Sequence, residues 1–265
     1  MTRVLPLICG TLLLALGACA PKRPSLPSGS GSPFPGFAAA YDEATAGCRD
    51  ARTVVAVLGL SGRAGGTRLR GQITAGLEAP ESIRLDAVAF GRPIFILAGR
   101  DGTATLLLPR DGRVIPDAPA QGIVEALAGV ALTPAELRAA IAGCGLGGSS
   151  PSNGRMFSDD WAAVDLGTTV TYLRRIQNRW HVAAAARDPL TLLYDDFGSG
   201  GPGRVFLRTA SARGGDPAAD IALSVSELEI NVPIDPKAFV VNVPPDADPL
   251  TLEELRRAGP LGERR

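Results

Sequence analysis

The sequence predicts a mainly β fold with some α structure, in which a curved antiparallel sheet of about 11 strands forms an unclosed barrel covered by a short two-helix lid. Apolar and polar side chains alternate along many short segments, as in strands that bury one face. The 265 residues include 32 Gly and 22 Pro but only 5% aromatic residues, which indicates many turns. Helical periodicity interrupts the strands at 121–144, and no βαβ alternation indicates a parallel sheet.

The first half of the sheet is predicted over residues 57–115, as an antiparallel meander of five strands. Along 67–77, apolar or small side chains fall on odd numbers and arginine or polar side chains on even numbers. The Gly65-Gly66 pair before this segment favours a tight hairpin turn. Residues 38 to about 57 have helical character, and the segment 54–60 either continues that helix or begins the first strand.

Two short helices are predicted between the two groups of strands. Ile123, Val124, Leu127 and Ala128 form one apolar stripe. After a break at Gly129, Thr133 is expected to cap a second helix, with Pro134 at its first position and Glu136 completing a capping box.

The second half of the sheet is predicted from Asp160 onward, after a loop at 145–155. Six segments alternate in the same way. In the last one the apolar register changes from odd to even numbers, which predicts a β-bulge near Ser226. A polar helix, Thr251–Ala258, lies in the C-terminal tail 251–265.

The N-terminus has the pattern of a secreted protein. Arg3 precedes an apolar run of about 13 residues, which is shorter than the roughly 20 residues that span a bilayer. Leu16-Gly17-Ala18-Cys19 resembles the lipobox of bacterial lipoproteins. That resemblance implies a signal peptide over 1–18 and a lipid anchor on Cys19, and Ala20 after the cysteine favours the outer membrane, facing the periplasm.

A flexible tether rich in Pro, Gly and Ser is predicted over 19–37, and it would reach about 50 Å if extended. One domain then follows over 38–250. Cys48 and Cys144 are expected to form a disulfide that closes a loop of about 97 residues and stabilises the fold by about 4 kcal/mol. The alternative is that both are reduced, buried thiols.

Several function classes find no support in the sequence. Equal numbers of basic and acidic residues, 27 each, give no electrostatic basis for binding nucleic acid. The single histidine, His181, has no recognisable partners for catalysis and is expected on a solvated strand face. The sequence therefore predicts no catalytic residues, no metal site and no cofactor.

Three segments resemble the LolA/LolB-like superfamily of periplasmic lipoprotein carriers and outer-membrane lipoprotein receptors. They are Leu60–Leu77, Ile83–Ala98 and the closing Pro233–Ala247. The resemblance implies an unclosed barrel whose cavity holds acyl chains or another apolar ligand. It also implies an exposed loop with an apolar tip, for which 90–93 is the candidate, and an inner-strand arginine that holds the lid. Arg63, Arg70 and Arg84 remain open for that role.

Alanines on both strands and helices are expected to leave part of the interior unfilled. The candidate cavity residues are Leu69, Ile73, Ile83, Leu85, Phe95, Leu97, Leu106, Leu108, Ile123, Leu127, Leu137 and Ile141. The resulting hypothesis is a lipid-anchored periplasmic protein that acts in lipoprotein or lipid delivery to the outer membrane. The alternative is a non-enzymatic structural or interaction module of a cell-envelope complex, with the same fold, a filled interior and an envelope protein as partner.

Overall fold

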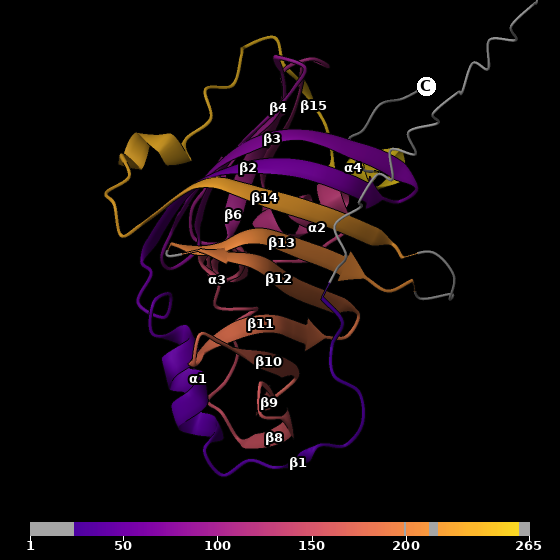
Figure 1. The fold of residues 1–265 in the computed structure, drawn as a ribbon. Helices are drawn as coiled ribbons and strands as arrows, with labels where there is room; N and C mark the ends of the chain where they lie inside the picture. Colours follow the sequence, from indigo (N-terminus) through magenta and orange to yellow (C-terminus); the bar gives the residue numbers. More distant parts are fainter. Residues whose placement is uncertain (1–23, 199, 212–216, 260–265) are drawn as a thin grey trace, which may run out of the picture.

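The computed structural model describes residues 24–198, 200–211 and 217–259. The predicted signal peptide 1–18 and the predicted lipid anchor Cys19 lie outside the described residues. Within these ranges the chain forms one large, mostly antiparallel sheet of 15 strands together with four α-helices (Figure 1). No helix in the described part of the chain is long and apolar enough to cross a membrane.

The elements have the following bounds. The strands are β1 (Ser32–Pro33), β2 (Thr53–Ala64), β3 (Thr67–Glu78), β4 (Ser82–Ala89), β5 (Arg92–Gly99), β6 (Thr103–Leu108), β7 (Arg113–Pro119), β8 (Asn153–Ser158), β9 (Trp161–Leu166), β10 (Thr169–Ile176), β11 (Arg179–Arg187), β12 (Leu190–Gly198), β13 (Gly201–Thr209), β14 (Ala219–Ile230) and β15 (Asp248–Pro249). The helices are α1 (Phe37–Thr45), α2 (Ala120–Ala128), α3 (Pro134–Ala142), α4 (Leu252–Ala258) and the 3₁₀ turn η1 (Pro236–Phe239).

The sheet is two meanders joined side by side. Strands β8 to β14 follow one another on one side, β2 to β7 on the other, and β14 pairs with β2 at the junction. Strands β1 and β15 are the two outer edges and do not pair with each other, so the sheet is unclosed. The predicted fold class is therefore confirmed at the level of one large unclosed sheet that is mainly antiparallel, and only the β7–β15 pair is parallel among the described strands.

The predicted strand number was too low. The first meander has six strands instead of five, and β8 occupies part of the segment that was expected to be a loop. Strands β1 and β15 have only two residues each. These additional strands are short or lie near the sheet edges. They are held by pairing with a neighbouring strand, and their side chains do not alternate strongly.

The first helix is shorter than its predicted extent. It ends at Thr45, and β2 begins at Thr53. The run Thr53-Val54-Val55 is β-branched, which favours a strand, and Val54 lies opposite both Ile230 of β14 and Leu77 of β3. The choice left open for 54–60 is thus settled in favour of a strand.

Local sequence signals for turns, caps and the bulge are confirmed. Gly65 and Gly66 both have positive φ, as a tight hairpin requires. Helix α3 has the full capping box between Thr133 and Glu136. The β14–β2 register shifts between Val225 and Glu227, at the predicted bulge.

The helices cover different parts of the sheet. Helix α1 contacts β8 to β11, and Gly154 of β8 leaves no room for a Cβ beside Phe37. Helix α3 packs on β2, β3 and β13, whereas α2 lies against β6 and β7, with α4 on its other side (Figure 1). The residues between β14 and β15 form a long strap that carries η1 along the outside of β4 and β5.

The described part of the predicted tether lies against the sheet. Leu26 packs on a cluster formed by Ala184, Leu193 and Phe206. Farther along, Ser32–Pro33 pairs with β8 as strand β1. Leu26 and β1 thus contact the sheet, and the role of residues 19–37 as a tether stays a prediction.

Candidate functional site

A cavity of about 840 Å³ lies between the sheet and the two central helices. This volume falls within the range of small-molecule pockets, roughly 300–1,000 Å³. The sheet side of the cavity is formed by β2 to β5, β13 and β14, and the helix side by α2, α3 and the connection between them. Most of the wall is apolar, so the cavity suits an apolar guest.

The strand side of the cavity follows from alternation and register. Leu58 of β2 lies opposite Ile73 of β3, and Leu60 lies opposite Gly71, so these residues share one face. Next to them β14 adds residues to the same face, with Leu223 opposite Leu60. Because successive side chains of a strand point to opposite faces, every second residue faces the interior along the enclosed part of these strands, whereas consecutive residues of β3 and β4 line the cavity only near its mouth.

A β-bulge changes this rule in β5. Ala87 pairs with Phe95, but the next residue, Val88, pairs with Pro93, so Ile94 has no partner on β4. Bulges redirect side chains in this way. Ile94 and Phe95 consequently both line the cavity although they are neighbours in the sequence.

Seven of the twelve predicted cavity residues line the cavity. They are Leu69, Ile73, Leu85, Phe95, Leu127, Leu137 and Ile141. The other five are buried in the packed core and do not line the cavity: Ile83, Leu97, Leu106, Leu108 and Ile123. Since α2 packs directly on β6 and β7, that end of the interior is filled by side chains.

Other lining residues were not predicted. The alternation in β2 and β14 could have identified the inward-facing residues of these two strands. That β14 lies next to β2, and so near β3, depends on pairing between distant parts of the chain, which alternation does not reveal. Nine further apolar residues line the cavity although the sequence did not predict them there: Leu58, Leu60, Ile94, Val124, Val130, Leu132, Leu207, Ile221 and Leu223. Ala87, Ala89 and Ala128 also line the cavity, and their small side chains leave volume unfilled.

The mouth of the cavity is polar and exposed. The β3–β4 pairing ends at Gln72 and Val88, so the first residues of β3 have no neighbour on that side. Around this opening the exposed lining residues are Arg68, Arg70, Gln72, Val88, Phe90, Arg92, Arg110 and Asp111. Phe90 is 77% exposed and has positive φ at the tip of the β4–β5 hairpin, so the predicted loop 90–93 does present an apolar tip.

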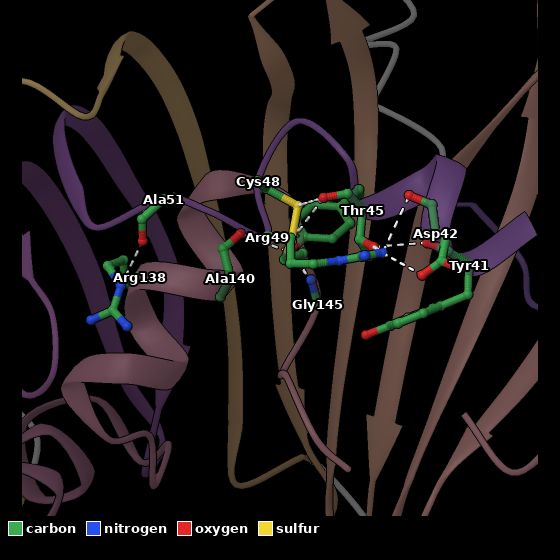
Figure 2. The surroundings of a disulfide bond; sticks show 11 residues. Tyr41, Asp42, Thr45, Cys48, Arg49, Ala51, Arg138, Ala140 and Gly145 are labelled. Atoms are coloured by element: carbon green, nitrogen blue, oxygen red, sulfur yellow. Dashed lines mark hydrogen bonds and ion pairs between the residues drawn. A yellow bond between two sulfur atoms is a disulfide. The ribbon is translucent and has the colours of Figure 1, made fainter. Parts of the chain in front are cut away.

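A disulfide fastens the C-terminal end of α3. Cys48, just after α1, is bonded to Cys144, just after α3, with a Cα–Cα distance of 5.7 Å. The predicted pairing is confirmed. Figure 2 shows this region, with Thr45 and Arg49 on the α1 side and Ala140 and Gly145 on the α3 side.

Tyr194 of β12 holds the same end of α3 from the sheet. Its hydroxyl donates a hydrogen bond to the carbonyl of Ala140 (2.6 Å) and accepts one from the amide of Gly145 (3.0 Å). The side chain is fully buried. Burial raises the pKa of the Tyr194 hydroxyl far above its ordinary value, and the hydrogen bond from Gly145 opposes this only partly, so the hydroxyl remains a donor at all working pH values.

Two arginines also hold α3, but neither is one of the three arginines that the sequence suggested for this role. Arg138 of α3 donates to the carbonyls of Ala51 (3.1 Å) and Pro80 (3.0 Å). Arg187, at the end of β11, forms an ion pair with Glu136 of α3. Both pairings connect positions distant in sequence, so no local pattern could have identified them.

The three candidate arginines have other surroundings. Arg84 pairs with Asp86 and donates to two carbonyls of the strap. Arg63 is exposed on β2, and Arg70 is exposed at the cavity mouth. None of them bonds to α2 or α3 in the part of the chain that the structure describes.

His181 is half-buried on β11, with its ring 5.4 Å from that of Phe197. The predicted solvated face is thus only partly solvated. Among the described residues the imidazole of His181 makes no hydrogen bond, and no group of three or more His, Cys, Asp or Glu side chains is placed to hold a metal ion. Burial lowers the pKa of His181, the nearby Arg179 lowers it further, and Glu43 opposes both.

Acidification is expected to destabilise the fold modestly through His181. Its folded-state pKa is lower than its ordinary value of 6.5, so below about pH 6.5 the unfolded chain binds more protons than the folded one. Stability is therefore complete above that pH and falls as the pH decreases toward the folded-state pKa. Melting temperatures of the wild type and His181→Gln, compared at pH 7.5 and 5.5, should differ more at the higher pH. An equal difference at both pH values would contradict this origin.

Comparison with known proteins rests on structure. No family model matches the sequence, and no curated protein matches it significantly. A LolA superfamily protein from Nitrosomonas europaea matches over 77% of this chain and 97% of its own, with a TM-score of 0.52 and 11% identity.

Two other solved structures match with lower TM-scores. A Vibrio parahaemolyticus domain described as an outer membrane lipoprotein-sorting protein has a TM-score of 0.45 and 10% identity, covering 75% of this chain and 93% of its own. The Mycobacterium tuberculosis lipoprotein LppX has a TM-score of 0.33 and 11% identity, covering 76% and 99%. The chain therefore has the fold of a LolA superfamily protein.

Proposed function

We propose that this protein is a lipid-anchored binding protein that takes acyl chains, or another apolar ligand, into the cavity between its sheet and helices. In this proposal it acts in lipoprotein or lipid delivery to the outer membrane. The fold supports the proposal, because a LolA superfamily protein shares it. The sequence Leu16–Cys19 supports a lipid anchor and therefore a place at a membrane surface.

The observation that carries the proposal is the unfilled apolar cavity. A structural module with a filled interior would place side chains where this chain has about 840 Å³ of space. Transfer of an acyl chain from water into such a space is favourable by about 0.8 kcal/mol per methylene. A chain of ordinary length would thus gain enough free energy to bind without any specific polar contact, which favours binding over the alternative.

The hairpin tip at the mouth supports exchange with a membrane or with another carrier. Phe90 is exposed beside the opening, and aromatic side chains favour the interface between water and lipid. An acyl chain that leaves a bilayer at this hairpin would meet the cavity directly. Nothing in this route requires bond chemistry, and we propose that the protein is not an enzyme.

Filling the cavity is expected to abolish uptake of an apolar probe. Ala128, the last residue of α2, lines the cavity, and Ala128→Trp would place an indole ring in the space the ligand needs. We expect a fluorescent fatty acid to bind the full-length Cys19→Ser chain, which lacks acyl chains of its own, and to bind Ala128→Trp at least about tenfold more weakly. Fluorescence titration measures both affinities.

The matched control is Ala39→Trp, which adds the same side chain to an exposed position of α1 outside the cavity. It should bind the probe like the parent chain. Circular dichroism of both variants shows whether they are folded. Equal binding by the two tryptophan variants, or no binding by the folded parent, would refute the proposed function.

A further inference from the structure

Four arginines surround the cavity mouth. Arg68 and Arg70 lie on β3, Arg92 begins β5, and Arg110 lies in the turn between β6 and β7. All four are exposed, and all four belong to the lining of the cavity. Arginines from three separate elements therefore belong to the lining of one opening.

This concentration of charge is local. The chain as a whole has equal numbers of basic and acidic residues, 27 of each. The lining of the cavity contains the four arginines and a single carboxylate, Asp111. The mouth thus has a positive charge that the composition of the protein does not impose.

The four mouth arginines also have no partners. Within the described residues, none of their side chains forms an ion pair or a hydrogen bond. Some other arginines of the same sheet are paired, as Arg84 is with Asp86 and Arg155 with Asp165. The donors at the mouth are therefore free to bind an anion.

Protection of an unpaired strand edge explains only part of this pattern. The first residues of β3 have no neighbour on the β4 side, and charged side chains on such an edge prevent pairing with another chain. That explanation accounts for Arg68 and Arg70. It does not account for Arg92 and Arg110, which lie on other elements of the same mouth.

We propose that the ligand is an anionic amphiphile, whose acyl chains occupy the cavity and whose phosphate or carboxylate headgroup is bound by Arg68, Arg70, Arg92 and Arg110. This inference rests on the proposed function of the cavity. A guanidinium group offers several donors in a planar arrangement that matches the oxygens of a carboxylate or phosphate. An apolar interior with a cationic mouth selects molecules that combine both features.

Two pairs of lipids test the headgroup separately from the chains. A fluorescent fatty acid is compared with its methyl ester, and a fluorescent phosphatidic acid with the diacylglycerol that has the same chains, using the full-length Cys19→Ser chain. At least one anionic member should bind about tenfold or more tightly than its neutral partner in 50 mM salt. The preference should decrease in 500 mM salt, because salt screens exposed charges.

Variants of the arginines show whether the mouth is responsible. Changing all four mouth arginines to glutamine should abolish the preference and leave binding of the neutral lipids unchanged. The control changes the same number of charges at exposed arginines outside the cavity lining, and it should keep the preference. Its positions are Arg52, Arg174, Arg179 and Arg257.

The outcomes separate this inference from the function on which it rests. If no lipid binds, the proposed function fails. If neutral and anionic lipids bind equally, or if the preference survives in the mouth variant, the cavity holds apolar chains but the headgroup site does not exist. Inorganic phosphate at millimolar concentration should not displace the anionic lipid, and displacement would show a site for a free anion instead.

Discussion

Replacing Cys48 and Cys144 together by alanine is expected to lower the free energy of unfolding by about 4–5 kcal/mol in the chain-entropy model. The bond joins residues separated by 96 positions, so its loss releases a long loop in the unfolded chain. It also frees the end of α3 from the segment after α1. Urea denaturation followed by circular dichroism measures the change.

Reduction of the wild type provides the control for the disulfide. Dithiothreitol should lower the stability of the wild type toward that of the double-alanine variant and should leave the variant unchanged. A double variant as stable as the oxidised wild type would mean that the bond contributes no stability. A variant that still binds lipid after losing this stability would show that the cavity tolerates a looser α3.

Tyr194→Phe is expected to lower the free energy of unfolding by about 1–3 kcal/mol. The change leaves the buried Gly145 amide without its partner, and it removes one of the two hydrogen bonds of the Ala140 carbonyl, which still accepts from the Gly143 amide. An unpaired buried polar group costs roughly 1–3 kcal/mol. Urea denaturation again measures the effect.

Tyr172→Phe is the matched control, because the Tyr172 hydroxyl makes no hydrogen bond within the described residues. Its stability should remain close to that of the wild type. If the two variants lose equal stability, the hydrogen bonds of Tyr194 are not the cause. Since Tyr194 and the disulfide hold the same end of α3, their effects should not be additive when combined.

The elements that the sequence predicts well are those that local chemistry determines. The alternation along β3 defines its buried face, and the capping box at Thr133 determines where α3 begins. The register change in β14 reveals its bulge without any knowledge of the neighbouring strand. Each of these signals lies within a few residues of the feature that it predicts.

The parts that the sequence does not predict depend on distant partners. The β14–β2 pairing, which places Leu223 and Leu60 in one wall, joins residues about 160 positions apart. The bulge that turns Ile94 inward has no local signal. Four strand residues among the predicted cavity residues lie in the packed core instead, because alternation identifies the buried face of a strand but not which part of that face lines the cavity.

Leu26 packs on the outer face of the sheet, so an anchor at Cys19 would hold the domain through a shorter free segment than the predicted tether 19–37. If the chain is anchored at Cys19, only seven peptide steps separate the anchor from the docked leucine, or about 25 Å at full extension. That is roughly half the reach of the whole predicted tether. In that case Leu26 would stay within this distance of the membrane surface that holds the anchor.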